Sequence, residues 1–513
     1  MKPGRTEPTE IKMNSLAPKL IAVALLVACT LPATASDPQK VGSVDISQWR
    51  GFNLLEKYKP HNQTPFNEDD FKWIEELGFN FVRLPMDYRC YTETNDWLKF
   101  KEPMLKEIDQ AIEFGAKHRI HVCINLHRAP GFCINPPAEA TDLWKDQAPQ
   151  DAFVAHWTMF AKRYQHIPQE QLSFNLLNEP TRNTRESYVK VNSRAIEAIH
   201  AVDPKRIIVV DGNNVGKDAF PEFLKYSNVV QATRGYHPGT ISHYKASWVK
   251  GSDKMPEPTW PPSKVIGQLF GPVKKDLKAP LVLQGDLKPG TDITLKLFQF
   301  SSKAKLQAKA DGKVIGELLC DAKAQPAAWK PLKSGKYTYY EPAKELSFSL
   351  KLATGAKEIS IENVDGDWIK FTELSLQVPG EARHIYVTDL SWGAKQEAHT
   401  VTGDGRLLPP PGANPSQTLV NYLKPWRDFS AQGGAVLVGE WGCHNKTPHP
   451  VMLAWMKAWL EEWKQARYGW VVWNFRGSFG ILDSQRSDVQ YEDWHGHKLD
   501  REMLKLLQEY QKY

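Results

Sequence analysis

The chain has 513 residues, of which 41% are hydrophobic and 24% charged, so it is long enough for more than one folded domain, and disorder does not dominate it. The net charge is +6, but lysine and arginine are scattered, which argues against a nucleic-acid-binding surface. Aromatic residues are abundant, with 18 Trp, 17 Tyr and 21 Phe, and such a surplus occurs both in large cores and in binding clefts.

Residues 1–35 are predicted to be an export signal. Residues 20–28 form an apolar run that is too short to span a bilayer, and a small-residue cleavage site ends at Ala35. The end of the run also resembles a bacterial lipobox with Cys29 as the lipidated residue, and Met13 is an alternative start. We therefore expect a secreted, periplasmic or outer-membrane lipoprotein of a bacterium, whose one route to the membrane is a lipid anchor at Cys29.

The six cysteines do not predict a disulfide framework, because an odd number remains once Cys29 is set aside. One bridge is compatible with export, and Cys90 and Cys133 are the candidates because each follows a predicted strand. No CxxC or HExxH spacing indicates a metal site, and no cofactor is expected.

Short apolar segments alternate with amphipathic ones along most of the chain. The predicted strands are residues 49–55, 80–86, 121–126, 171–177, 207–211, 229–235, 435–439 and 468–474. Helical spacing of apolar residues marks residues 67–77, 103–118, 416–429, 452–465 and 499–510. This alternation predicts an α/β protein, a (β/α)8 TIM barrel built from residues 41–261 and 380–513.

The pattern changes between the sixth and seventh predicted strands. Residues 262–379 contain short alternating strands at 281–283, 292–298, 304–310, 346–352, 357–363 and 369–377. Turn pairs such as Asp311-Gly312 separate them. This region is predicted to be a β-sandwich inserted in the loop after strand 6.

Two glutamates lie where predicted barrel strands end. Glu179 follows the fourth strand in the sequence Asn178-Glu179-Pro180, and Glu440 follows the seventh. Active sites of this fold sit at the carboxyl ends of the strands. Cleavage of a glycosidic bond needs two carboxyl groups, one on each side of that bond. A single strand-end glutamate is more often a salt-bridge partner or a cap. Further positions are therefore needed to identify these two glutamates as a catalytic pair.

Seven such positions, in order and on the expected strands, resemble glycoside hydrolase family 5: Arg83, His127, Asn178, Glu179, Tyr236, Glu440 and Trp473. Residues 473–483 are also similar to bacterial members described as cellulases. The resemblance covers nearly the whole barrel and implies a retaining mechanism, with Glu179 as acid/base and Glu440 as nucleophile.

The remaining roles are also implied by this resemblance. Arg83 would keep Glu440 ionised, and Tyr236 would orient it. Asn178 would contact the sugar 2-hydroxyl, His127 would line the glycone side, and Trp473 would form a stacking floor.

One position departs from the family pattern. Members usually have a histidine two residues before the strand-six tyrosine, where this chain has Arg234. His237, which follows the tyrosine, is a second candidate for that role, and both residues are predicted to bind substrate. His243 and Trp248 are cleft-wall candidates, for which surface packing is the alternative.

The inserted sandwich is similar to carbohydrate-binding modules at residues 362–368, and both glycan binding and a scaffolding role stay open. The sequence favours a retaining endo-β-1,4-glucanase that acts on a β-linked polysaccharide or oligosaccharide. A β-mannanase, a xyloglucanase and an exo-β-glucosidase are the alternatives on the same barrel. A non-catalytic glycan-binding lipoprotein is the alternative of another class, favoured by Arg234 alone. We expect a monomer with no nucleic-acid partner.

Overall fold

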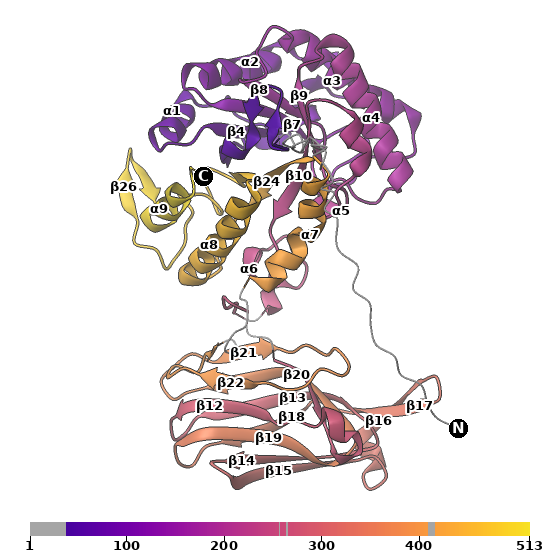
Figure 1. Cartoon of the computed structure of the whole chain (residues 1–513), viewed down its shortest axis with the longest axis vertical. Coiled ribbons are helices and arrows are strands. Elements are labelled where there is room, and N and C mark those ends of the chain that lie inside the picture. Colours follow the sequence, from indigo (N-terminus) through magenta and orange to yellow (C-terminus); the bar gives the residue numbers. More distant parts are fainter. Residues whose placement is uncertain (1–36, 256, 263–264, 409–415, 513) are drawn as a thin grey trace, which may run out of the picture. The chain divides into compact units, whose positions relative to one another are not determined.

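The computed structural model describes residues 37–255, 257–262, 265–408 and 416–512 (Figure 1). The predicted export signal at residues 1–35, with Met13, Cys29 and Ala35, lies outside these ranges. Across them, no helix is both long and apolar enough to cross a membrane.

Eight parallel strands close into a barrel, with the last strand paired to the first. In chain order they are β3 (Arg50–Asn53), β4 (Phe81–Asp87), β7 (His121–Arg128), β8 (Leu172–Asn175), β9 (Ile207–Asp211), β10 (Val229–Gly235), β24 (Ala435–Trp441) and β25 (Gly469–Val472). Every residue of the eight strands is buried except Val229, as expected for strands covered on both faces. The predicted (β/α)8 barrel is therefore confirmed.

Helices cover the outside of the barrel (Figure 1). They are α1 (Glu68–Glu76), α2 (Glu102–Lys117), α3 (Gln147–Tyr164), α4 (Arg185–Val202), α7 (Gln417–Ala431), α8 (His449–Ala466) and α9 (Arg501–Glu509). In α2, Leu105, Ile108 and Ile112 recur at helical spacing and are buried in the barrel core. The unit after β9 differs, because only α5 (Asn213–Gly216) and the 3-10 turn η4 (Pro221–Lys225) connect β9 to β10.

The amino end of the barrel is closed by the start of the described chain. A two-stranded hairpin, β1 (Lys40–Val41) and β2 (Val44–Asp45), leads into the first barrel strand. Ile46 and Trp49 pack with the first residues of three strands, such as Phe81, in one buried cluster. The opposite, carboxyl end is therefore the end available for a substrate.

The chain between β10 and α7 forms two antiparallel-rich sheets around their own apolar core. One sheet contains β11 (Gln268–Phe270), β13 (Asp292–Phe300), β16 (Trp329–Ser334), β17 (Tyr337–Pro342), β18 (Leu346–Lys351), β20 (Trp368–Gln377) and β21 (His384–Val387). The other contains β12 (Leu281–Leu287), β14 (Lys303–Ala310), β15 (Lys313–Asp321), β19 (Ala356–Gly366), β22 (Ala398–Val401) and β23 (Leu407–Leu408). This is the sandwich expected after the sixth strand.

The sandwich extends further than the predicted boundary at residue 379. Strand β21 pairs with β20, β22 pairs with β12, and β23 pairs with β22, so the sheets continue to Leu408. The barrel resumes at α7 rather than at residue 380.

The suggested disulfide between Cys90 and Cys133 is wrong. Both are free thiols, as are the other three cysteines among the described residues. The Cys90 thiol donates to the carbonyl of Lys57, and the Cys133 thiol donates to the carbonyl of His127. Each thiol is thus satisfied by backbone in a buried position.

Candidate active site

Polar and aromatic side chains from seven strands meet at the carboxyl end of the barrel. They lie within these strands or directly after them: Arg83 in β4, His127 in β7, Asn178 and Glu179 after β8, Asp211 in β9, Arg234 in β10, Tyr236 after β10, Glu440 in β24 and Trp473 after β25. Closure of the barrel brings them together, although they are spread over most of the chain.

Glu440 is buried and held by two donors at its carboxylate. Arg83 donates from Nη1 to Oε1 at 2.6 Å, and the hydroxyl of Tyr236 donates to Oε2 at 3.3 Å. Arg234 adds a longer ion pair, with Nη2 lying 3.6 Å from Oε1. Two guanidinium groups therefore lie against the same carboxylate oxygen.

Arg83 is itself fixed by three further hydrogen bonds. Its Nε donates to Oδ1 of Asn175 at 2.7 Å, and its Nη1 donates to Oδ1 of Asn53 at 2.9 Å. Its Nη2 donates to Oδ1 of Asn178 at 2.8 Å. The planar guanidinium is therefore locked against the barrel wall, which orients the contact to Glu440.

Glu179 has a different environment. Its backbone φ is +49°, a left-handed conformation that costs a non-glycine residue about 1 kcal/mol. Its N–H donates to Oδ2 of Asp211 at 2.9 Å, and its carboxylate accepts from Nε of Arg234 at 3.2 Å. Burial and then the negative charge of Glu440 raise the pKa of Glu179 to about 7, although Arg234 opposes this shift.

Arg234, which replaces the expected histidine, lies in the centre of the site. Its guanidinium pairs with Asp211 and also reaches Glu179 and Glu440. Its Nη2 donates to Oδ1 of Asn178 at 2.8 Å as well. Asp211 was not predicted from the sequence, although it also ends a barrel strand.

His127 is a buried, neutral imidazole. Its Nε2 accepts from the side-chain amides of Asn178 at 3.3 Å and Asn135 at 3.2 Å, which leaves the proton on Nδ1. Burial and then the positive charge of Arg83 hold the pKa of His127 well below its usual value. Since Asn178 also accepts from two arginines, its amide orientation is fixed.

An aromatic corner stands beside this histidine. The half-buried ring of Trp473 lies 5.6 Å from the ring of His127 and 5.6 Å from the ring of Tyr58. Tyr58 follows β3 and packs edge-on against His127 at 4.6 Å. It was missed because no motif surrounds it in the sequence. Such a corner offers a flat apolar face to a sugar ring.

A second aromatic group surrounds Tyr236. His243 packs edge-on against Tyr236 with ring centroids 5.0 Å apart, and Phe479 lies 6.2 Å from it. Trp248 contacts His243 and Phe479, yet 58% of its surface is exposed. His243 therefore adjoins a residue that touches Glu440, and Trp248 lies beside His243.

His237 is placed differently from the other candidates. Its ring stacks on Tyr422 of α7 at 5.0 Å, and its carbonyl accepts from the indole N–H groups of Trp455 and Trp459 at 3.0 Å each. Its contacts are to helices, whereas Arg234 makes the contacts to both carboxylates. Arg234 therefore occupies the place for which His237 was the second candidate.

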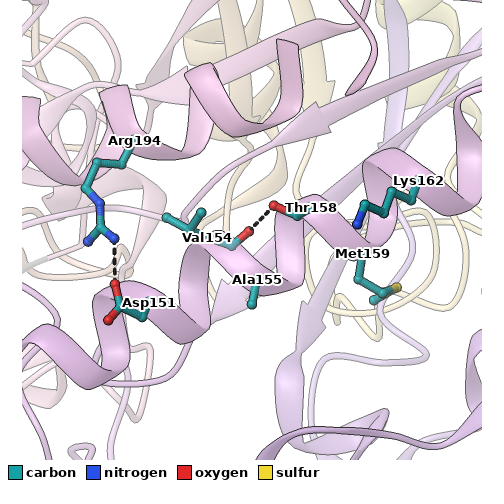
Figure 2. A pocket seen from close by; sticks show the side chains of 7 residues that line it. All are labelled: Asp151, Val154, Ala155, Thr158, Met159, Lys162 and Arg194. Atoms are coloured by element: carbon teal, nitrogen blue, oxygen red, sulfur yellow. Dashed lines mark hydrogen bonds and ion pairs between the residues drawn. The ribbon is translucent and has the colours of Figure 1, made fainter. Parts of the chain in front are cut away.

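A separate hollow of about 590 Å³ lies between α3 and α4 on the outside of the barrel (Figure 2). Its rim includes an ion pair of 2.5 Å between Nη2 of Arg194 and Oδ1 of Asp151. None of the predicted site residues lines it. The predicted site residues lie at the carboxyl ends of the barrel strands instead.

At the strand ends, the carboxyl groups of Glu440 and Glu179 lie in one buried cluster of charged side chains. Glu440 is suited to attack or to stabilise a cation, and Glu179 is suited to carry a proton near neutral pH.

Comparison with known proteins points to one family of glycoside hydrolases. Residues 37–255 match the family model described as "Cellulase (glycosyl hydrolase family 5)". Endoglucanase C of Acetivibrio thermocellus is 31% identical over 209 residues, which are 40% of this chain and 58% of that protein. This chain thus spans under two thirds of the length of this relative.

Solved structures agree on the fold. A structure described as a glycoside hydrolase is 28% identical, with 90% of this chain and 99% of that chain covered and a TM-score of 0.57. The endoglucanase Cel5A from Thermotoga maritima, at 16% identity, covers 90% of this chain and 97% of that one with a TM-score of 0.51, which shows the fold alone. The family model matches residues 37–255, which hold six of the eight barrel strands, so this part of the chain is similar to glycoside hydrolase family 5.

Proposed function

We propose that the protein is a retaining glycoside hydrolase acting on a β-linked glucan, as a cellulase-like endo-β-1,4-glucanase. The observation that carries this proposal is the pair Glu179 and Glu440. Both contact the guanidinium of Arg234, but Glu440 is also paired with Arg83, whereas burial and the charge of Glu440 raise the pKa of Glu179 to about 7. Two carboxyl groups with separated roles are what glycosidic cleavage requires.

In the first step, the carboxylate of Glu440 attacks the anomeric carbon and forms a glycosyl ester. The bond from that carbon to the glycosidic oxygen breaks, and Glu179 gives its proton to the departing oxygen. Arg83 and Tyr236 hold Glu440 in place for this attack. Asn178, fixed by both arginines, is the candidate partner of the sugar 2-hydroxyl.

In the second step, Glu179 acts as a base. Once Glu440 is esterified, its negative charge is gone, so the pKa of Glu179 falls and Glu179 is ionised. It takes a proton from water, whose oxygen attacks the anomeric carbon and releases Glu440. Two inversions leave the configuration retained.

The choice of a β-glucan is supported by names among the relatives. Endoglucanase C and, at 27% identity over 188 residues, Cellodextrinase A of Ruminococcus flavefaciens are both similar to this chain. A β-xylosidase of Phanerodontia chrysosporium is similar as well, at 28% identity over 180 residues, so the sugar has to be tested directly.

The test is turnover by the mature protein on β-glucans, mannan, xyloglucan and aryl β-glycosides, with reducing ends and anomeric configuration followed over time. We expect hydrolysis of a β-1,4-glucan with retained configuration, lost in Glu179→Gln and in Glu440→Gln. Absence of turnover on every substrate, with sugar binding intact, would replace this proposal by a glycan-binding barrel.

Trp248 gives a prediction about substrate binding. Because its exposed ring adjoins the aromatic group around Tyr236, Trp248→Ala should remove a stacking surface and raise KM for cello-oligosaccharides roughly three- to tenfold. We expect kcat to change little. The control is Leu224→Ala, which removes a residue that is 38% exposed on η4. Equal KM values for Trp248→Ala and the wild type would assign Trp248 to surface packing.

Export, the monomeric state and a glycan-binding sandwich are further proposals from the sequence. Lipidation at Cys29 predicts that radiolabelled fatty acid is incorporated into the wild type and not into Cys29→Ala. Cleavage after Ala35 predicts a mature amino terminus at Ser36, which mass spectrometry of the exported protein would detect.

A further inference from the structure

Five charged or titratable groups form one buried network, which we call the charged cluster: Arg83, Glu179, Asp211, Arg234 and Glu440. With Glu179 protonated, the cluster contains two guanidinium charges and two carboxylate charges. It is then neutral, the least costly condition for groups removed from water. Loss of any one charge leaves a net charge in the cluster unless Glu179 changes its protonation state.

Asp211 accepts three hydrogen bonds, two of them from members of this cluster. Its Oδ2 accepts from the N–H of Glu179 at 2.9 Å and from Arg234, and its Oδ1 accepts from the amide of Asn175 at 2.9 Å. The bond to the N–H holds Glu179 at the point where its backbone is left-handed. One carboxylate therefore fixes the position of Glu179 and also offsets the arginine beside it.

The other groups around Glu179 do not supply this offset. His127 on β7 is neutral because burial lowers its pKa. Burial raises the pKa of the hydroxyls of Tyr58 after β3 and Tyr236 after β10, and it raises that of Tyr422 on α7 to about 12. Arg83 on β4 is already paired with Glu440 on β24. Asp211 on β9 is thus the charge left to balance Arg234.

We propose that Asp211 is a positioning residue of the reaction, which places Glu179 through its backbone N–H and neutralises Arg234 so that Glu179 keeps its proton in the free enzyme. This inference rests on the proposed function. It makes Asp211 and Arg234 one unit, in which the charge of each offsets the charge of the other. Loss of the Asp211 charge should therefore lower the pKa of Glu179, and loss of the Arg234 charge should raise it.

The test is the pH profile of kcat/KM for Asp211→Asn, Arg234→Gln and the double variant, measured on a cello-oligosaccharide whose leaving group needs a proton. In the wild type the rate should fall as the pH rises through about 7, where Glu179 loses its proton. Asp211→Asn should move this fall to lower pH by about one unit or more, because Arg234 is no longer balanced. Arg234→Gln should move it to higher pH, and the double variant should return towards the wild type.

A dinitrophenyl β-glycoside is the control substrate, because its leaving group departs without a proton and its first step should not show this fall in any variant. Wild-type turnover with an unshifted profile in a folded Asp211→Asn would overturn the inference and leave the proposed function intact. Absence of wild-type turnover would instead overturn the proposed function. If Asp211→Asn does not fold, Arg234→Gln against the double variant decides, since adding Asp211→Asn must then lower the pH of the fall.

Discussion

Replacement of Glu440 by glutamine should lower kcat/KM on every substrate on the order of 10⁴-fold or more, because no other group can form the glycosyl ester. Glutamine keeps the shape of the side chain, and its one carbonyl oxygen can still accept from Arg83, while its NH2 group can donate to the hydroxyl oxygen of Tyr236. The lost negative charge is replaced when Glu179 ionises, which restores neutrality in the charged cluster. We therefore expect the variant to fold, with a thermal melt at pH 7 close to that of the wild type.

Rescue by azide distinguishes loss of the nucleophile Glu440 from a loss of folding or of substrate binding. In Glu440→Ala, azide can enter the space left by the carboxylate and displace dinitrophenolate from the opposite face of the sugar. The expected product is the α-glycosyl azide from a β-glycoside, identified by NMR. Recovery of the β-azide would show that a nucleophile other than Glu440 still acts first.

The barrel could be predicted because each of its strands is a short apolar run, buried on both faces and followed by a different kind of segment. The strand ends were predicted within a few residues; the sixth was expected at 229–235 and is Val229–Gly235. Once the strands are placed, their carboxyl ends must meet, and Glu179 and Glu440 come together without any local signal.

The rest of the site depends on contacts that a pattern does not record. Asp211 ends its strand as clearly as Glu440 does, but its role becomes visible only through the ion pair with Arg234. Tyr58 reaches His127 from a loop with no regular pattern. The sandwich was predicted to end too early because β21, β22 and β23 are each four residues or fewer, too short for alternation to be recognised.

Replacement of Glu179 by glutamine should have an effect that depends on the leaving group. On cello-oligosaccharides, the loss of the acid should lower kcat/KM about 10²- to 10⁴-fold, the usual contribution of general acid catalysis. On a dinitrophenyl β-glycoside, the first step should be nearly unaffected, so the glycosyl ester accumulates and a burst of dinitrophenolate precedes slow turnover. Glutamine should also abolish the fall in rate above about pH 7, because the group that titrates there is gone.

Azide gives the opposite stereochemistry in this second case. In Glu179→Ala, Glu440 still forms the ester on one face, and azide then enters from the side vacated by Glu179 and yields the β-glycosyl azide. The two alanine variants must therefore produce opposite anomers from the same substrate, since the two carboxyl groups lie on opposite faces of the sugar ring. Matching anomers from both variants would contradict the assignment of acid/base and nucleophile, even if both variants had lost activity. The anomeric configuration of the azide product, rather than the size of the activity loss, therefore identifies the glutamate that attacks.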